Sequence, residues 1–149
     1  MADAVRIEDR VEILDLFHQY ADALDFKDWT RLEGLFTPDV KSLWFEQYQV
    51  DGREQVIGFI SDLVGKVGRT HHMVSNFRVS FDGDTAEASV RVKAYHVGIG
   101  DKAGLFEESL GTFDASVART PGGWRFTRFD EALFVMLGTQ EVFGLGEPA

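Results

Sequence analysis

The amino-acid sequence predicts an α+β fold in which a curved, mixed or antiparallel sheet wraps around N-terminal helices. Apolar residues recur at helical spacing near the start of the chain of 149 residues. From Thr70 onward the period changes to two, and turn sequences at 82–84 and 120–123 divide the alternating part into strands. No Pro- or Ser-rich linker interrupts the chain, so one domain over residues 1–149 is expected.

Three helices are expected before this sheet. The first runs from about Val5 to Asp25 and carries one broad apolar face, made of Ile7, Val11, Leu14, Phe17, Ala21 and Leu24. Asp28 is the expected N-cap of a second helix, which the sequence Thr37-Pro38-Asp39 ends. A third helix follows Gly52 and closes at residues 65–68. The first two helices should pair as a hairpin.

The expected strands are rich in β-branched and aromatic residues. Val40–Val50 forms one strand, and three or four more follow Thr70. On one of them apolar residues alternate with charged ones, which predicts a dry face of Ala86, Ala88, Val90, Val92 and Ala94. Similar dry faces are expected on the next two strands, from Phe113, Ala115 and Val117 and from Trp124 and Phe126.

The composition argues against several classes of partner and location. The chain has 25 acidic and 15 basic residues, a net charge of −10, whereas nucleic acids and anionic membranes attract clustered Lys and Arg. Because Cys is absent, no disulfide framework forms. The first ten residues are too charged for a secretory signal, and apolar runs such as Ala132–Leu137 are too short to span a bilayer. We therefore expect a soluble cytoplasmic protein.

Ionisable residues on dry faces are the candidates for function, because an unpaired buried charge is costly. Asp25 continues the helical stripe of Leu14, His18 and Ala21, so its carboxylate should be partly buried under the sheet. An equally weighted alternative is a loop carboxylate that caps a backbone N–H or pairs with Lys27.

Two further candidates extend the dry faces of strands. His96 follows Ala94 at period two and should point inward, as a catalytic group or as a core His bonded to a backbone carbonyl. Arg128 follows Phe126 in the same way, and Asp130 lies two residues further on. For this pair an internal salt bridge is preferred over a catalytic Arg.

The adjacent residues His71 and His72 fall on opposite faces of one strand. Alternation places His71 with Phe77 and Val79, and His72 with Asn76, although either face of a strongly curved sheet can line a pocket. A metal site is not expected from this pair, because adjacent rings diverge and no H-E-x-x-H motif is present. No Ser nucleophile elbow, Walker loop or dinucleotide Gly fingerprint occurs either, so no cofactor is expected.

Three short stretches carry a family resemblance: residues 10–29, Leu35-Phe36-Thr37-Pro38-Asp39, and Thr70-His71-His72-Met73-Val74-Ser75-Asn76. Together they resemble the SnoaL-like branch of the nuclear-transport-factor-2-like superfamily, especially scytalone dehydratase, bile acid dehydratase and hexachlorocyclohexane dehydrochlorinase. The resemblance covers residues from about 5 to 128. It implies a cone-shaped α+β barrel of cystatin-like form, a pocket between the long helix and the concave sheet, no cofactor, and homo-oligomers such as dimers or trimers.

The resemblance also implies roles for particular residues. His72 matches the general base and Asp25 the carboxylate that orients it, while His96 resembles a second pocket His. Leu24 replaces a Tyr that in scytalone dehydratase holds a water on the substrate carbonyl, so polarisation of the substrate must come from elsewhere. Arg119 and Arg128 are both candidates for an Arg that related enzymes use; the sequence does not choose between them.

The expected function is that of a cofactor-independent dehydratase acting on a mainly apolar, cyclic hydroxy-ketone. His72 and Asp25 would act as the acid/base pair, with His96 or Tyr20 assisting the departure of the hydroxyl group. The residues expected to contact the substrate are Tyr20, Trp44, Tyr48, Asn76 and Arg128. The alternatives are a ketosteroid-type isomerase or polyketide cyclase, and a non-catalytic ligand-binding or assembly domain. A His72 pKa raised by an ionised Asp25 would favour an enzyme.

Overall fold

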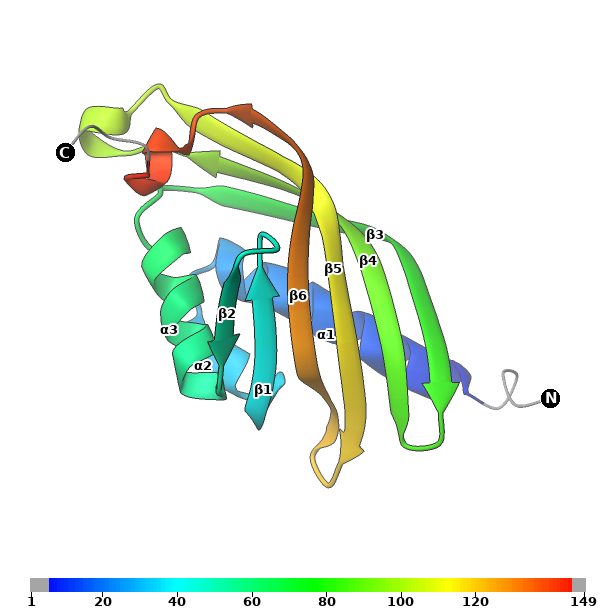
Figure 1. Ribbon diagram of the computed structural model, residues 1–149. Coiled ribbons are helices and arrows are strands. Elements are labelled where there is room, and N and C mark those ends of the chain that lie inside the picture. The colour runs from blue at the N-terminus through cyan, green and yellow to red at the C-terminus, as the bar shows by residue number, and fades with distance from the viewer. Residues whose placement is uncertain (1–5, 146–149) are drawn as a thin grey trace.

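Six strands form one sheet within residues 6–145, the part of the chain that the computed structural model describes. This sheet bends across one long helix (Figure 1). The elements in chain order are α1 (Ile7–Asp25), α2 (Trp29–Glu33), β1 (Phe36–Trp44), β2 (Tyr48–Asp51), α3 (Arg53–Val64), β3 (Thr70–Asp82), β4 (Thr85–Val97), the 3-10 turn η1 (Gly100–Lys102), β5 (Phe106–Thr120), β6 (Gly123–Gly138) and the 3-10 turn η2 (Gln140–Phe143). Val5, the expected first helical residue, lies outside the described range. No helix within residues 6–145 has the length and apolar character needed to cross a membrane.

The sheet has the strand order β2-β1-β6-β5-β4-β3. All neighbouring strands are antiparallel except β1 and β6, which are parallel. The expected α+β fold with a curved mixed sheet is therefore confirmed. The sheet stays open, with β2 and β3 as its two edge strands, so it does not close into a barrel.

The core lies between α1 and the concave face of the sheet. The buried side of α1 carries Ile13, Leu16, Phe17, Tyr20, Ala21, Ala23 and Leu24. Phe17 packs on Phe126 with ring centroids 5.1 Å apart, and Tyr20 packs on Phe129 at 4.5 Å. Ile7 and Val11, expected on the same face, are exposed, because the sheet contacts the side of α1 that carries Ile13, Phe17 and Tyr20.

The segment after α1 differs from its prediction in two places. Asp28 caps α2 as expected, because its carboxylate accepts a hydrogen bond from the backbone N–H of Arg31 at 3.3 Å. However, α2 ends at Glu33, and β1 already begins at Phe36. The single strand expected over Val40–Val50 is a hairpin of β1 and β2, since Phe45 and Glu46 adopt positive φ and turn the chain.

A β-bulge interrupts β3. Ser75 pairs with Arg91 and Arg78 pairs with Ser89, so two residues of β3 lie opposite one of β4. Asn76 lies in this bulge with φ of 54°. The extra residue reverses the alternation of side chains. The partly buried face consequently carries His72 before the bulge and Phe77 after it, which removes the conflict between alternation and resemblance over the two histidines.

A second irregularity has the same effect on β6. Ser116 pairs with Arg128, whereas Val117 pairs with Phe126, so Thr127 is an extra residue. After this bulge the inner face continues through Phe129, which is fully buried. The expected inward position of Arg128 is therefore wrong, because the alternation on which it rested changes phase one residue earlier.

Candidate active site

His72 and Asp25 are hydrogen bonded to each other beneath the edge of the sheet. His72 lies near the start of β3, and Asp25 is the last residue of α1. The His72 Nδ1 lies 2.7 Å from Oδ1 of Asp25, and the side chains of His72 and Asp25 are only 4% and 17% exposed. Because an ionised carboxylate can only accept, Nδ1 carries the proton. The Nε2 atom is thus left unprotonated and basic when His72 is neutral.

Two neighbours hold the Asp25 carboxylate in place. The backbone N–H of His72 donates to Oδ2 at 3.0 Å, and the Thr70 hydroxyl donates to Oδ1 at 2.8 Å. Lys27, the other expected partner, adopts a positive φ and donates instead to the backbone carbonyls of Val64 and Val67, both at 2.8 Å. Of the two alternatives for Asp25, the ion pair with Lys27 is therefore not formed, whereas the carboxylate does accept a backbone N–H, that of His72.

The two groups perturb each other's ionisation. Burial by itself raises the pKa of Asp25, but the hydrogen bonds from His72 and Thr70 outweigh it and lower that pKa below its ordinary value. Burial lowers the pKa of His72, and the nearby His96 lowers it further, while the hydrogen bond with Asp25 opposes both. The direction is opposite to the raised pKa expected from Asp25 alone. A neutral His72 beside an ionised Asp25 is the form that accepts a proton.

A second histidine–carboxylate pair adjoins the first. The His96 Nδ1 lies 2.6 Å from Oε2 of Glu107, and the Ser109 hydroxyl donates to the other oxygen of Glu107. The rings of His72 and His96 are 5.3 Å apart and nearly perpendicular. The inward position predicted for His96 is confirmed, as it is 6% exposed.

Glu107 was missed at the level of sequence, although a signal existed. Extending the dry face of Phe113 back along β5 at period two leads through Ser109 to Glu107. A carboxylate at the end of an otherwise apolar row is the same kind of signal that pointed to His96.

A cavity of about 450 Å³ opens beside this second pair. Its lining includes the polar cluster of His96, Glu107 and Ser109. Four further polar or charged residues line it, Gln47, Asp62, Lys66 and Gln140, together with aromatic and aliphatic side chains from several elements: Phe45, Tyr48, Phe59, Leu63, Leu133, Phe143 and Leu145. The ring of Phe143, from η2, packs edge-on against His96 at 4.9 Å. Over residues 6–145, no three His, Asp or Glu side chains are grouped as ligands of a metal ion. Apolar side chains thus make up the larger part of the cavity surface, and its polar and charged groups come from several segments of the chain.

The sequence model of the SnoaL-like domain family matches residues 5–130 of the chain. The chain belongs to the SnoaL-like domain family. An uncharacterized protein of Mycobacterium tuberculosis is 33% identical to this SnoaL-like chain over 129 residues, covering 86% of the chain and 87% of the relative.

Solved structures share the same fold. A putative aromatic ring hydroxylase from Novosphingobium aromaticivorans has a TM-score of 0.82 at 28% identity, over 91% of this chain and 96% of that one. A putative scytalone dehydratase from the same organism has a TM-score of 0.82 at 21% identity, over 94% and 93%. A hexachlorocyclohexane dehydrochlorinase from Novosphingobium barchaimii has a TM-score of 0.80 at 16% identity, over 93% and 94%. At 21% and 16% identity, the similarity to the last two structures is evidence for a shared fold alone.

Three of the expected substrate contacts lie on or near the inner face of this SnoaL-like fold. Tyr48 lines the cavity and is 49% exposed. Tyr20 lies inside the aromatic core instead of at the helix edge, and burial above all raises its pKa. Trp44 is also buried, and its indole N–H has no hydrogen-bond partner among the described residues.

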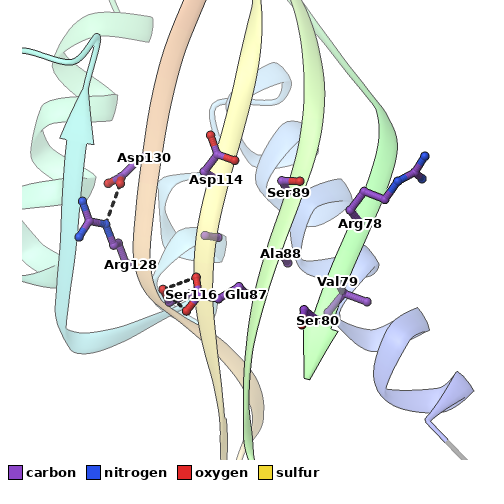
Figure 2. A pocket seen from close by; sticks show the side chains of 11 residues that line it. Arg78, Val79, Ser80, Glu87, Ala88, Ser89, Asp114, Ser116, Arg128 and Asp130 are labelled. Atoms are coloured by element: carbon purple, nitrogen blue, oxygen red, sulfur yellow. Dashed lines mark hydrogen bonds and ion pairs between the residues drawn. The ribbon is translucent and has the colours of Figure 1, made fainter. Parts of the chain in front are cut away.

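The other expected contacts lie on the outer face or surface. Arg128 is exposed and forms an ion pair with Asp130 at 2.7 Å, so the expected pair exists but is not internal. Figure 2 shows both residues beside a groove of about 340 Å³ on the outer face of the sheet. Asn76 is exposed and accepts a hydrogen bond from Ser75. Arg119 pairs with Asp9 at 2.9 Å, also on the surface. Neither Arg lines the cavity that contains His96.

Glu131 is a second acidic residue that sequence reasoning missed. It follows Phe129 at period two on the inner face of β6, beyond the bulge. Burial, and then the negative charge of Glu107, raises the pKa of Glu131 to about 8. Alternation continued from Phe126 leads to Arg128 and Asp130, so no pattern in the sequence pointed to Glu131.

Proposed function

We propose that this SnoaL-like protein is a cofactor-independent lyase that removes water from a mainly apolar, cyclic hydroxy-ketone. The observation that carries the proposal is the hydrogen bond between His72 and Asp25. The His72 ring lies next to the ring of His96, which lines the cavity. A buried, neutral imidazole whose Nδ1–H is held by a carboxylate is well suited to accept a proton at Nε2.

In this mechanism His72 takes the proton from the carbon next to the substrate carbonyl. Asp25 keeps the Nδ1–H in place and stabilises the imidazolium that forms, and proton transfer of this kind accelerates reactions by roughly 10²–10⁴-fold. The electrons of the broken C–H bond form an enolate, which then expels the hydroxyl group on the next carbon. His96 enters this step as the imidazolium, with its Nδ1–H held by Glu107, and donates its Nε2 proton to the departing hydroxyl, which leaves as water while His96 becomes neutral.

The cavity walls support an apolar ligand. Phe45, Phe59 and Phe143 offer flat apolar surfaces, and a cavity of about 450 Å³ has the size of a small-molecule site. Two of the similar structures are named for eliminations, a dehydratase and a dehydrochlorinase, which agrees with a reaction started by a base. A third is named as a hydroxylase, so the names by themselves do not select one chemistry.

The nearest alternative is an isomerase or cyclase, which would use the same base without losing a leaving group. The His96–Glu107 pair favours elimination, because it supplies a second proton-transfer group for the departing hydroxyl. A homo-oligomeric state remains a prediction.

The test is a screen of the purified protein against hydroxy-ketones of steroid, polyketide and naphthalenone type, with loss of water followed by mass spectrometry. His72→Ala and Asp25→Asn should abolish or strongly reduce turnover. The matched control is His71→Ala, since His71 is exposed on the opposite face of the same strand. Rearrangement without loss of water would indicate the isomerase or cyclase, and equal turnover by His72→Ala and wild type would refute the proposed base.

A further inference from the structure

The outer face of the sheet carries a cluster of exposed apolar side chains at the end near η1 and η2 (Figure 1). Seven of the fifteen exposed large apolar side chains within residues 6–145 lie in this cluster. They come from four neighbouring strands: Met73 of β3, Tyr95 and Val97 of β4, Phe106 of β5, and Phe134, Val135 and Leu137 of β6. We call these seven residues the outer patch.

The outer patch lies on the opposite face of the sheet from the candidate active site. On β4, Tyr95 directly precedes the buried His96, so the two side chains point to opposite faces. On β5, Phe106 precedes the buried Glu107 in the same way. The strands that carry the two groups of the second histidine–carboxylate pair therefore present apolar side chains on their other side.

Contacts between the strands make the outer patch continuous. The ring of Tyr95 stacks on that of Phe106, with centroids 5.4 Å apart and planes 10° apart. The guanidinium of Arg91, from β4, lies 5.5 Å from the centroid of the Phe134 ring on β6. An apolar surface that runs without a break over neighbouring strands is typical of a protein–protein contact.

Strand pairing lines up the side chains of the outer face in rows that cross the sheet from β3 to β6. One row is Met73, Lys93, Leu110 and Val135, and the next is His71, Tyr95, Glu108 and Leu137. Beyond the bulge at Asn76, a further row is Arg78, Ser89, Asp114 and Asp130 (Figure 2). In these rows the basic side chains come from β3 and β4, and the acidic ones come from β5 and β6.

A second copy of this chain fits these rows when a two-fold axis runs parallel to the strands, between β4 and β5. Such an axis places β3 opposite β6 of the second copy, and β4 opposite its β5, within the same row. Met73 then meets Val135, and the Tyr95 hydroxyl meets the Glu108 carboxylate. Glu108 is paired with Lys93 of its own chain at 2.9 Å and keeps lone pairs that can accept from this hydroxyl.

The charges of the outer face select this axis. In none of the rows named above does it place like charges opposite each other, and it brings Arg78 opposite Asp130. A two-fold axis across the strands would instead place Lys93 opposite Lys93, or Glu108 opposite Glu108, depending on which row of the outer patch it passes through. Like charges that face each other disfavour a contact.

We propose that the outer patch is the interface of a homodimer, in which two copies of this chain pack sheet against sheet about the axis between β4 and β5. Burial of the apolar side chains of the outer patch drives the association. Because His96 and Glu107 lie on the inner face of the same strands, the second copy covers the outside of the sheet at the candidate active site. The inference does not depend on the reaction proposed above.

The first experiment measures the oligomeric state by sedimentation equilibrium, with circular dichroism as a check of folding. The wild type should be a dimer. Val135→Glu places a charge in the interface and should raise the dissociation constant of the dimer by at least about 30-fold. Val11→Glu, a matched control at an exposed position of α1, should leave that constant unchanged. A monomeric wild type, a trimer, or a dimer that the folded Val135→Glu variant forms equally well would overturn the inference.

The second experiment tests the axis by cross-linking, which is possible because the chain has no Cys of its own. Met73→Cys and Val135→Cys are prepared separately, mixed to exchange subunits, and treated with a short bismaleimide. The mixture should give a covalent dimer, since the two new thiols face each other. Met73→Cys alone should not, because strands about 4.8 Å apart leave its two thiols about 14 Å apart sideways.

The results of cross-linking decide the question even if Val135→Glu does not fold. Cross-linking confined to the mixture would support the proposed axis. A covalent dimer of Met73→Cys with itself, or no covalent dimer from the mixture while the wild type is dimeric, would overturn it.

Discussion

Asp25 accepts two hydrogen bonds from the single residue His72, one from the backbone N–H at 3.0 Å and one from the ring Nδ1 at 2.7 Å. The same carboxylate therefore attaches the end of α1 to the edge strand β3 and sets the orientation of the imidazole. A substitution of Asp25 should consequently affect both the contact between α1 and β3 and the orientation of the His72 ring.

Replacing Asp25 should lower the His72 pKa further. In Asp25→Asn the charge that favours the imidazolium is lost, while burial and His96, which both disfavour it, remain. Loss of a charge-assisted hydrogen bond should also reduce the free energy of unfolding by about 1.5–3 kcal/mol. NMR titration of the His72 ring measures the pKa, with Asp22→Asn, an exposed site on the same helix, as the control. A His72 pKa that rises in Asp25→Asn would contradict this account.

The bulge residue Asn76 should tolerate Gly but not Val. Asn76 has φ of 54°, which costs most residues about 1–2 kcal/mol relative to Gly and more for a β-branched side chain. Urea unfolding should therefore give Asn76→Val a free energy of unfolding at least about 1 kcal/mol lower than that of Asn76→Gly. Ser80→Val, exposed on the same strand, serves as the control and should stay within about 0.5 kcal/mol of the wild type.

Deleting Asn76 should leave His72 on the inner face. Without the extra residue, Phe77 directly follows Ser75, and regular alternation places Phe77 on the same face as Val74 and His72. The His72–Asp25 hydrogen bond should therefore be retained, along with its effect on the His72 resonances in NMR spectra. Loss of that hydrogen bond in a folded deletion variant would show that the bulge itself is needed to position His72.

Removal of the Tyr20 hydroxyl should leave stability unchanged or raise it. The Tyr20 side chain is buried, and within residues 6–145 no hydrogen bond to its hydroxyl is formed, so Tyr20→Phe keeps the aromatic packing and removes no stabilising hydrogen bond. Urea unfolding of Tyr20→Phe and of the exposed control Tyr48→Phe measures the effect. A loss of more than about 2 kcal/mol in Tyr20→Phe alone would indicate a partner that the structure does not contain.

Glu131 should make the protein less stable as the pH rises. Its pKa is about 8 in the folded chain against 4.5 in the unfolded chain, so between these values the folded state binds more protons. Stability contributed by this group is therefore full below about pH 4.5 and is lost toward pH 8, at up to about 1.4 kcal/mol per pH unit. Urea unfolding at several pH values should show that the free energy of unfolding of Glu131→Gln increases relative to that of the wild type as the pH rises. Parallel curves for the two proteins would contradict the raised pKa.

Much of the fold was predictable because local patterns agree with it. Asp28 caps α2, the dry face of β4 is buried as expected, and His96 extends that face inward. Glu107 was also within reach, since it continues the inner face of β5 without any interruption. In these strands the period of two holds from end to end, so the side of each residue follows from its distance to a known core residue.

The amino-acid sequence by itself determined the α+β class, the order of helices and strands, and the presence of carboxylates and histidines at the ends of apolar rows. Only the tertiary structure decided which of these groups face the cavity. One unpaired residue at Asn76 turns His72 inward, and another at Thr127 turns Arg128 outward and Glu131 inward. The physical reason is that a β-bulge reverses the facing of the side chains that follow it until the next irregularity, and its position depends on pairing with the neighbouring strand, which the alternation within one strand does not reveal.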